Sequence, residues 1–158
     1  MKWIGQTSIL TIRPYRTEDR EGLFKIAADT AFFGEPIEAY MEDRRIFLDA
    51  FYAYYTDYEP EHCWVATADE TVVGFITGCV DTTRKEKVVN REINPRVLRR
   101  MLTGYYRIGP KARRYLWRMW KSKQKHLYPA VDLNQFPAHL HINVDKNWRG
   151  YGIGIRLL

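Results

Sequence analysis

The sequence predicts one α/β domain, and three observations support this class. The chain has 158 residues, of which 46% are hydrophobic and 15% aromatic, so it can bury a core of its own. Runs with an apolar residue at every second position, as in strands, alternate with runs that repeat every three or four, as in helices. No apolar run approaches the roughly 20 residues needed to cross a bilayer. We therefore expect a single domain over residues 1–158, with strands and helices packed together.

The first third of the chain predicts a strand and two helices. Segment 9–15, ILTIRPY, alternates apolar and polar residues and favours a strand. Segment 17–32 favours a helix, with Thr17 as its N-cap and acidic residues in its first turn. Segment 32–36, FFGEP, ends this helix, and its proline suits the first position of a second helix that ends near residues 57–61.

Two later segments predict the rest of the sheet. Segment 62–81 favours two strands joined by a turn at Asp69–Glu70. Gly74 and Gly78 within the second of these strands indicate a bulge or a close backbone approach. Segment 138–145 favours another strand, whose apolar face carries Leu140, Ile142 and Val144 and whose polar face carries His139, His141, Asn143 and Asp145.

Between these strands lies a basic segment, residues 82–127, which we interpret as a helical insertion. From Thr82 to Lys125 it has 15 basic and 2 acidic residues, a net charge of +13, so the rest of the chain sums to −7. Helices are predicted to begin at Asn94–Pro95 and Gly109–Pro110. The segment could be a solvated cover over the sheet edge, a surface near cofactor phosphates or an acidic partner, or a contact for nucleic acid or an anionic membrane.

The motif RGYGIG, residues 149–154, follows the last predicted strand and opens a helix. Such a turn presents unpaired backbone N–H groups to an anion, and glycines allow positive φ and close approach. The motif lacks the Lys-Ser/Thr of a P-loop and the glycine order of a dinucleotide fold. A tight turn that needs glycine for its geometry alone is the alternative.

The stretch LHINVDKNWRGYGIGIRLL closely resembles the acetyl-CoA-binding motif of the GNAT superfamily of N-acyltransferases. Val144 matches the end of the strand, Arg149 opens the motif, and Gly152 and Gly154 match its glycines. LTIRPYRTED and CWVATADETVVGFITG resemble the family's first strand and central hairpin. A narrower resemblance is to acetyltransferase-like domains related to those of O-GlcNAc hydrolases. The resemblance implies a mixed, mainly antiparallel central sheet flanked by helices.

The resemblance also implies acetyl-CoA as the cofactor and an amine as the acceptor. Ile142, Asn143 and Val144 would pair with the pantetheine arm, and the Ile142 N–H would polarise the thioester carbonyl. The pyrophosphate would lie on the turn amides of Arg149, Gly150, Tyr151, Gly152, Ile153, Gly154 and Ile155.

Candidate catalytic and acceptor residues lie on the polar face of the last strand and at helix ends. His139, His141 and Asp145 are candidate bases, with packing or hydrogen bonding as the alternative for each histidine. Cationic primary amines suit an acidic, aromatic surface, which the sequence offers at Phe33, Glu35, Asp57, Tyr58 and Glu59. An ordinary solvated helix end is the alternative for that surface.

In the family, the fold continues with a further strand, a helix and at least one more strand. We therefore expect residues 1–158 to be an incomplete GNAT domain that lacks the C-terminal strands and helix. Its unpaired sheet edge would favour self-association. The expected function is that of an acetyl-CoA-dependent N-acetyltransferase, of which this chain would be the N-terminal portion. The first alternative is a non-catalytic CoA-binding or interaction module. The second is a nucleic-acid binder, and this second alternative we disfavour.

The chain has two cysteines, Cys63 and Cys79, which are too few for a disulfide framework or a zinc site. We expect core thiols, a cytoplasmic location and no bound metal.

Overall fold

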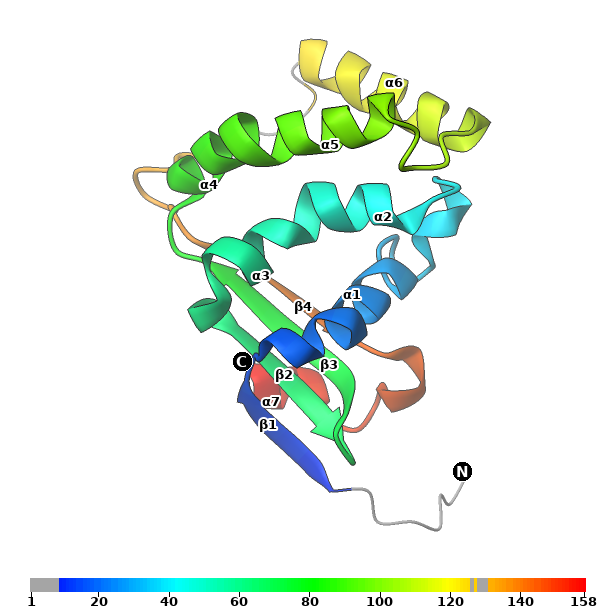
Figure 1. Ribbon diagram of the computed structural model, residues 1–158. Coiled ribbons are helices and arrows are strands. Elements are labelled where there is room, and N and C mark those ends of the chain that lie inside the picture. Colours follow the sequence, from blue (N-terminus) through cyan, green and yellow to red (C-terminus); the bar gives the residue numbers. More distant parts are fainter. Residues whose placement is uncertain (1–8, 126, 128–130) are drawn as a thin grey trace.

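The computed structural model describes residues 9–125, 127 and 131–158, and its centre is an antiparallel sheet (Figure 1). The strands follow the order β1-β2-β3-β4, and each pairs with its neighbour in the antiparallel sense. All four lie in the segments predicted from the sequence: β1 Leu10–Pro14, β2 Cys63–Ala68, β3 Thr71–Cys79 and β4 His139–Val144. The prediction of an α/β domain with a mainly antiparallel sheet is confirmed.

The β2–β3 hairpin turns at Asp69 and Glu70, as predicted, and both residues have positive φ angles of 46° and 67°. The ladder shifts register between Ala66 and Thr67, which confirms a bulge in this hairpin. Gly74 is a point of close approach, because a Cβ there would lie 3.2 Å from the Ile153 side chain. Both features expected from the strand glycines are present.

Helix α1, Arg20–Asp29, begins later than the sequence predicted. Thr17 opens a 3-10 turn, η1 (Thr17–Asp19), so its prediction as the N-cap of the helix is wrong. Asp19 is the N-cap residue of α1 but makes no side-chain capping bond to it; its carboxylate accepts the Arg16 N–H at 2.8 Å, within η1, and pairs with Arg13 at 2.7 Å. The Arg13 ion pair ties the start of α1 to β1.

The second helical region is interrupted rather than continuous. Its pieces are η2 (Ile37–Ala39), α2 (Arg44–Phe47), the π-helical turn η3 (Leu48–Tyr52), α3 (Ala53–Tyr58) and η4 (Pro60–His62). Pro36 lies just before η2 and not within it. Asp43 restarts the helix, because its carboxylate accepts the Arg45 N–H at 3.0 Å.

The basic segment forms one long helical run and then a separate helix. The run consists of α4 (Thr82–Val88), the π-helical turn η5 (Val89–Ile93) and α5 (Asn94–Leu102). The prediction that a helix begins at Asn94–Pro95 is confirmed, because α5 starts at Asn94 with Pro95 in its first turn, although η5 runs directly into it. Helix α6, Pro110–Gln124, begins at Gly109–Pro110 as predicted.

The helices form two layers on one face of the sheet. Helices α1 and α3 pack on the strands, and α4 to α6 lie on the outer side of α2 and α3 (Figure 1). The basic segment thus covers the helical layer, rather than a sheet edge. The other face of the sheet carries the short helix α7 (Ile153–Leu157), which follows the turn η6 (Lys146–Trp148). No helix in the described residues is long and apolar enough to cross a membrane.

Candidate active site

The open edge of β4 is the first component of the candidate site. Within the described residues, β4 pairs only with β3. The Asp145 N–H donates to the Val73 carbonyl at 2.9 Å, and backbone groups alternate in direction along an antiparallel strand. The N–H and C=O groups of Ile142 and Val144 therefore point away from β3, where an extended ligand carrying amides can pair with them; the Val144 carbonyl also accepts the Arg149 Nε–H at 3.4 Å.

The glycine-rich turn continues directly from this edge. Gly150 and Gly152 have φ angles of 86° and 72°, and an added Cβ at Gly150, Gly152 or Gly154 would meet nothing within 4 Å. Ile153 and Leu157 are buried against the sheet and hold α7 in place. The N–H groups of residues 150–154 have no hydrogen-bond acceptor among the described residues. The turn therefore offers open space and unpaired donors, which suit a phosphate group.

Side chains around the turn fix its position. The Asp145 carboxylate accepts the Asn147 N–H at 2.8 Å and so stabilises η6. The Asn143 amide donates to the Thr30 hydroxyl at 2.7 Å and holds β4 against the end of α1. Asp145 thus has a structural role at the Val144 end of β4, and the structure does not bring it together with the two histidines.

His139 lies in a hydrogen-bond network that defines its tautomer. The Thr82 hydroxyl donates to the Pro137 carbonyl at 2.6 Å, so its oxygen must accept from His139 Nδ1, 2.8 Å away. The lone pair of His139 Nε2 then faces the Tyr55 hydroxyl at 2.9 Å and Lys85 Nζ at 3.1 Å. Burial, followed by the charge of Lys85, lowers the pKa of His139. Both nitrogens of His139 are therefore engaged in hydrogen bonds.

Lys85 and Tyr55 complete this network, and neither was among the residues predicted from the sequence. Lys85 Nζ donates to the Tyr55 hydroxyl at 2.5 Å and lies 4.4 Å from the centre of the Tyr55 ring. Burial lowers the pKa of Lys85 and raises that of Tyr55. One signal was available: the Asp81 N-cap puts Thr82 and Lys85 three residues apart on one helix face.

His141 is the histidine with accessible nitrogens. No hydrogen bond links it to another described residue, although its ring lies 5.5 Å from that of Tyr55 and 6.0 Å from that of Tyr52. The side chain is exposed at the edge of β4, yet the aromatic rings on one side desolvate it. This desolvation, with smaller contributions from Lys85 and His139, lowers the pKa of His141 to about 4. His141 is therefore neutral at pH 7 and can accept a proton.

The residues predicted to form one acidic acceptor surface lie apart. Phe33 and Glu35 belong to the loop whose Gly34 lies beside the Arg149 guanidinium, 3.1 Å from where a Cβ would be. Glu59 lies near the other end of β4, because its carboxylate accepts the Val80 N–H at 3.2 Å and Val80 follows the partner of His139. A strand of this length separates the two groups by about 17 Å.

Most of the predicted acidic groups are also engaged internally. Asp57 pairs with Arg20 and, at 3.6 Å, with Arg96. The Tyr58 hydroxyl donates to Glu92 at 2.6 Å. Glu59 is fully buried and accepts the Tyr54 hydroxyl at 2.7 Å. The prediction of a single acidic rim is wrong, because these carboxylates stabilise the helices rather than face solvent together.

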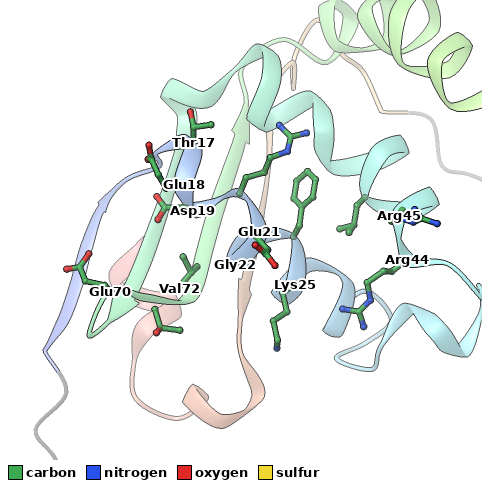
Figure 2. Close-up of a pocket in the computed structure, with 14 residues that line it drawn as sticks. Thr17, Glu18, Asp19, Glu21, Gly22, Lys25, Arg44, Arg45, Glu70 and Val72 are labelled. Atoms are coloured by element: carbon green, nitrogen blue, oxygen red, sulfur yellow. The ribbon is translucent and has the colours of Figure 1, made fainter. Parts of the chain in front are cut away.

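A separate hollow lies beside α1 and the β2–β3 turn, and Figure 2 shows its lining residues. Its basic side chains are already held: Lys25 by Asp29 at 2.8 Å and Arg44 by Asp29 at 3.0 Å. These basic side chains of the hollow are therefore already paired with a carboxylate, whereas the N–H donors of the turn after β4 are unpaired. The described residues also contain no group of three or more His, Cys, Asp or Glu side chains placed to hold a metal ion.

We compared the chain with protein-family models, curated proteins and solved structures. No protein-family model and no curated protein matches the sequence. The crystal structure of SsHAT matches with a TM-score of 0.72 and 28% identity, over 94% of this chain and 72% of that one. A mutant agmatine N-acetyltransferase in its apo form matches with a TM-score of 0.41 and 15% identity, over 94% of this chain and 66% of that one, a likeness too low to carry an argument by itself.

The chain has an acetyltransferase fold. The antiparallel sheet and the glycine-rich turn after β4 fit the GNAT-like arrangement that the sequence predicts. The likeness to SsHAT supports acetyl transfer in general.

Proposed function

We propose that this chain carries the donor-binding part of an acetyl-CoA-dependent N-acetyltransferase of the GNAT type. The single observation that carries the proposal is the continuity of the β4 edge with the turn. Outward backbone groups at Ile142 and Val144 lead directly to the unpaired N–H groups of residues 150–154. A ligand with an extended amide arm joined to a diphosphate matches both parts.

The residues present fit acetyl-CoA. The pantetheine amides would pair with the outward groups of Ile142 and Val144, beside Asn143, and the diphosphate would lie on the amides from Arg149 to Ile155. The open space at Gly150, Gly152 and Gly154 leaves room for phosphate oxygens. When bound, acetyl-CoA supplies an activated thioester. The outward N–H of Ile142 is the donor placed to stabilise negative charge on its carbonyl oxygen.

We assign proton acceptance to His141 and positioning to His139. His141 is neutral at pH 7 and has no competing hydrogen bond among the described residues. His139 is fixed by Thr82 and Tyr55, and its ring lies 5.7 Å from that of His141, so it limits the positions open to His141. An attacking amine must lose a proton, and His141 is the group that can take it.

The acceptor in this proposal is a primary amine that attacks directly. The buried rings of Tyr52 and Tyr55 lie behind His141 on the protein side, so the acceptor would approach His141 from its exposed side. Because Asp57 and Glu59 are engaged internally, only Glu35, beside the turn, could still favour a cationic acceptor.

A CoA-binding or interaction module without turnover is the second candidate. The observation that favours it is the open edge of β4, which gives the donor one strand wall within the described residues. The chain spans 72% of SsHAT, and a further strand beside β4 would supply the second wall. The two free, buried thiols of Cys63 and Cys79 support a reducing, cytoplasmic setting for either candidate.

Calorimetry with CoA and a thiol-release assay with acetyl-CoA and an amine panel separate these candidates. We expect CoA to bind the parent chain and Gly154→Val to abolish binding, because Gly154 is helical with open space around it and valine would fill that space. Equal CoA affinity in Gly154→Val would refute the proposed donor site. CoA binding without thiol release, in this chain and in one extended by a further strand, would favour the non-catalytic module.

A further inference from the structure

Helix α6 presents a strongly cationic outer face. Its sequence, PKARRYLWRMWKSKQ, has six basic residues and no acidic one. At about 100° per residue, the exposed side chains of this face fall on one half of the helix: Arg113, Arg114, Trp117, Arg118, Trp120 and Lys121. Ion pairs of the basic segment involve Arg84, Arg96 and Arg100, so these outer charges have no acidic partner among the described residues.

The same surface exposes large apolar side chains. Trp117 and Trp120 are 56% and 61% exposed, and Leu98 and Leu102 on the neighbouring α5 are 57% and 80% exposed. Leu98 lines a groove between α5 and α6 together with Leu116, one turn before Trp120. Exposed apolar groups therefore lie on both helices, on the two sides of this groove, and the cationic groups lie beside them on α6.

Helix α6 is seated firmly on the rest of the molecule. The Glu42 carboxylate accepts the N–H groups of Gly109, Lys111 and Ala112 at 3.2, 2.7 and 3.0 Å, which caps the helix start. Ala112 is fully buried on its inner side. The tryptophans and arginines on the outer side thus take no part in holding the helix. The fixed helix backbone keeps them on one side of it.

We propose that this outer surface of α5 and α6 docks onto the headgroup region of an anionic phospholipid bilayer. Basic side chains are attracted to the negative surface, while Trp117, Trp120 and the two leucines can enter the boundary between headgroups and acyl chains. The charge distribution orients the molecule, because the segment from Thr82 to Lys125 carries +13 and the rest −7. The acidic part then faces away from the membrane.

Two observations favour a bilayer over a nucleic acid. Leu98 and Leu102 are aliphatic and offer nothing to a phosphodiester backbone, whereas acyl chains accept them. The Lys121 ammonium lies 4.8 Å from the centre of the Trp117 ring, on one of the two faces that a base would stack against. Helix α7 packs on the other face of the sheet, so docking leaves the proposed donor site open and is independent of it (Figure 1).

Flotation of the chain with lipid vesicles tests this proposal. We expect binding to vesicles of 70% phosphatidylcholine and 30% phosphatidylserine, little binding to pure phosphatidylcholine, and a loss of binding as salt rises. The triple variant Arg113→Gln, Arg114→Gln, Arg118→Gln should lower the partition coefficient about 100-fold. The matched control Arg16→Gln, Lys25→Gln, Lys146→Gln removes as many exposed charges elsewhere and should change it less than about threefold.

The apolar contribution has its own variant. Trp117→Ser with Trp120→Ser should weaken binding to anionic vesicles by about tenfold or more. Circular dichroism checks the fold, and if the triple variant unfolds, Arg118→Gln alone should still lower partitioning about fivefold. The proposal is overturned if the parent does not float with anionic vesicles, if the charge variants float as well as the control, or if the parent binds a single-stranded oligonucleotide at concentrations where vesicles bind nothing.

Discussion

At the scale of single residues, the two histidines of β4 have different surroundings although they are two positions apart. His139 has both nitrogens in hydrogen bonds, to Thr82 on one side and to Tyr55 and Lys85 on the other. His141 has none with a described residue and keeps its lone pair accessible. These contacts are the basis on which we propose His139 as a positioning group and His141 as a proton acceptor.

The lowered pKa of His141 predicts acid sensitivity. The pKa of His141 is about 4 in the folded state against an ordinary value of 6.5, so the unfolded chain binds a proton more readily. The contribution of neutral His141 to the free energy of unfolding is therefore complete above pH 6.5 and is lost as the pH falls toward 4. His141→Gln should reduce the loss of unfolding free energy between pH 7 and pH 4.5, measured by chemical denaturation. His62→Gln, at an exposed histidine elsewhere, is the control. An identical pH dependence in parent and His141→Gln would contradict the assignment.

Removing the charge of Lys85 should raise the pKa of both histidines. Lys85 is the second largest cause of the lowered pKa at each of them, after burial. For Lys85→Met we expect each pKa to rise, yet to stay below the ordinary value because burial remains. Histidine ring signals followed by NMR titration measure this. Unchanged or lower pKa values would show that Lys85 does not act on the pair.

At the scale of elements, the turn after β4 depends on how α7 is anchored. This helix has five residues, too few to be stable alone, and it relies on two buried side chains packed against the sheet. Ile153 lies against Gly74, where the missing side chain makes room for it. The conformation that exposes the turn amides therefore depends on how α7 packs against the face of the sheet opposite the other helices.

Replacing the anchor should weaken both the fold and the turn. Ile153 is 1% exposed, and Ile153→Ala should lower the free energy of unfolding by about 2–4 kcal/mol. Ile155 is 81% exposed on the same helix, so Ile155→Ala should change it by less than about 0.5 kcal/mol. Denaturant titration compares the two variants. Equal effects would mean that α7 is not held by Ile153.

The sequence predicted some elements well and others poorly, for physical reasons. The strands and the turn at Asp69–Glu70 have local signals, alternation and turn residues, and the structure confirms them. The local signal at Asn94–Pro95 correctly predicts the start of α5, but it does not reveal that the π-helical turn η5 joins α5 to the preceding α4. The partnership of Tyr55 and Lys85 with His139 joins three distant segments, so no local pattern predicts it.

At the scale of the whole molecule, the two faces of the sheet differ in their cover. One face lies under two helical layers, whereas the other has α7 and leaves Trp64 and Leu140 43% and 49% exposed. The edge of β4 is open as well within the described residues. An apolar face next to an open edge favours contact with another strand or another chain.

This surface predicts self-association of the 158-residue chain. We expect the apparent mass in size-exclusion chromatography with light scattering to rise with concentration. Leu140→Lys, which places a charge on the open strand, should reduce association by about tenfold. Leu98→Lys on α5 serves as a control of similar exposure, since Leu98 is 57% exposed and Leu140 49%. A parent chain that stays monomeric up to high concentration would contradict this prediction.

The central claim, that the β4 edge and the glycine-rich turn bind acetyl-CoA, is tested most directly by amide chemical shifts recorded during a titration with CoA. The account predicts that the largest changes fall on the amides of residues 142–155, with smaller changes at the neighbouring loop around Gly34. Changes centred instead on the hollow beside α1, at residues such as Gly22 and Lys25, or no saturable change at all, would contradict it.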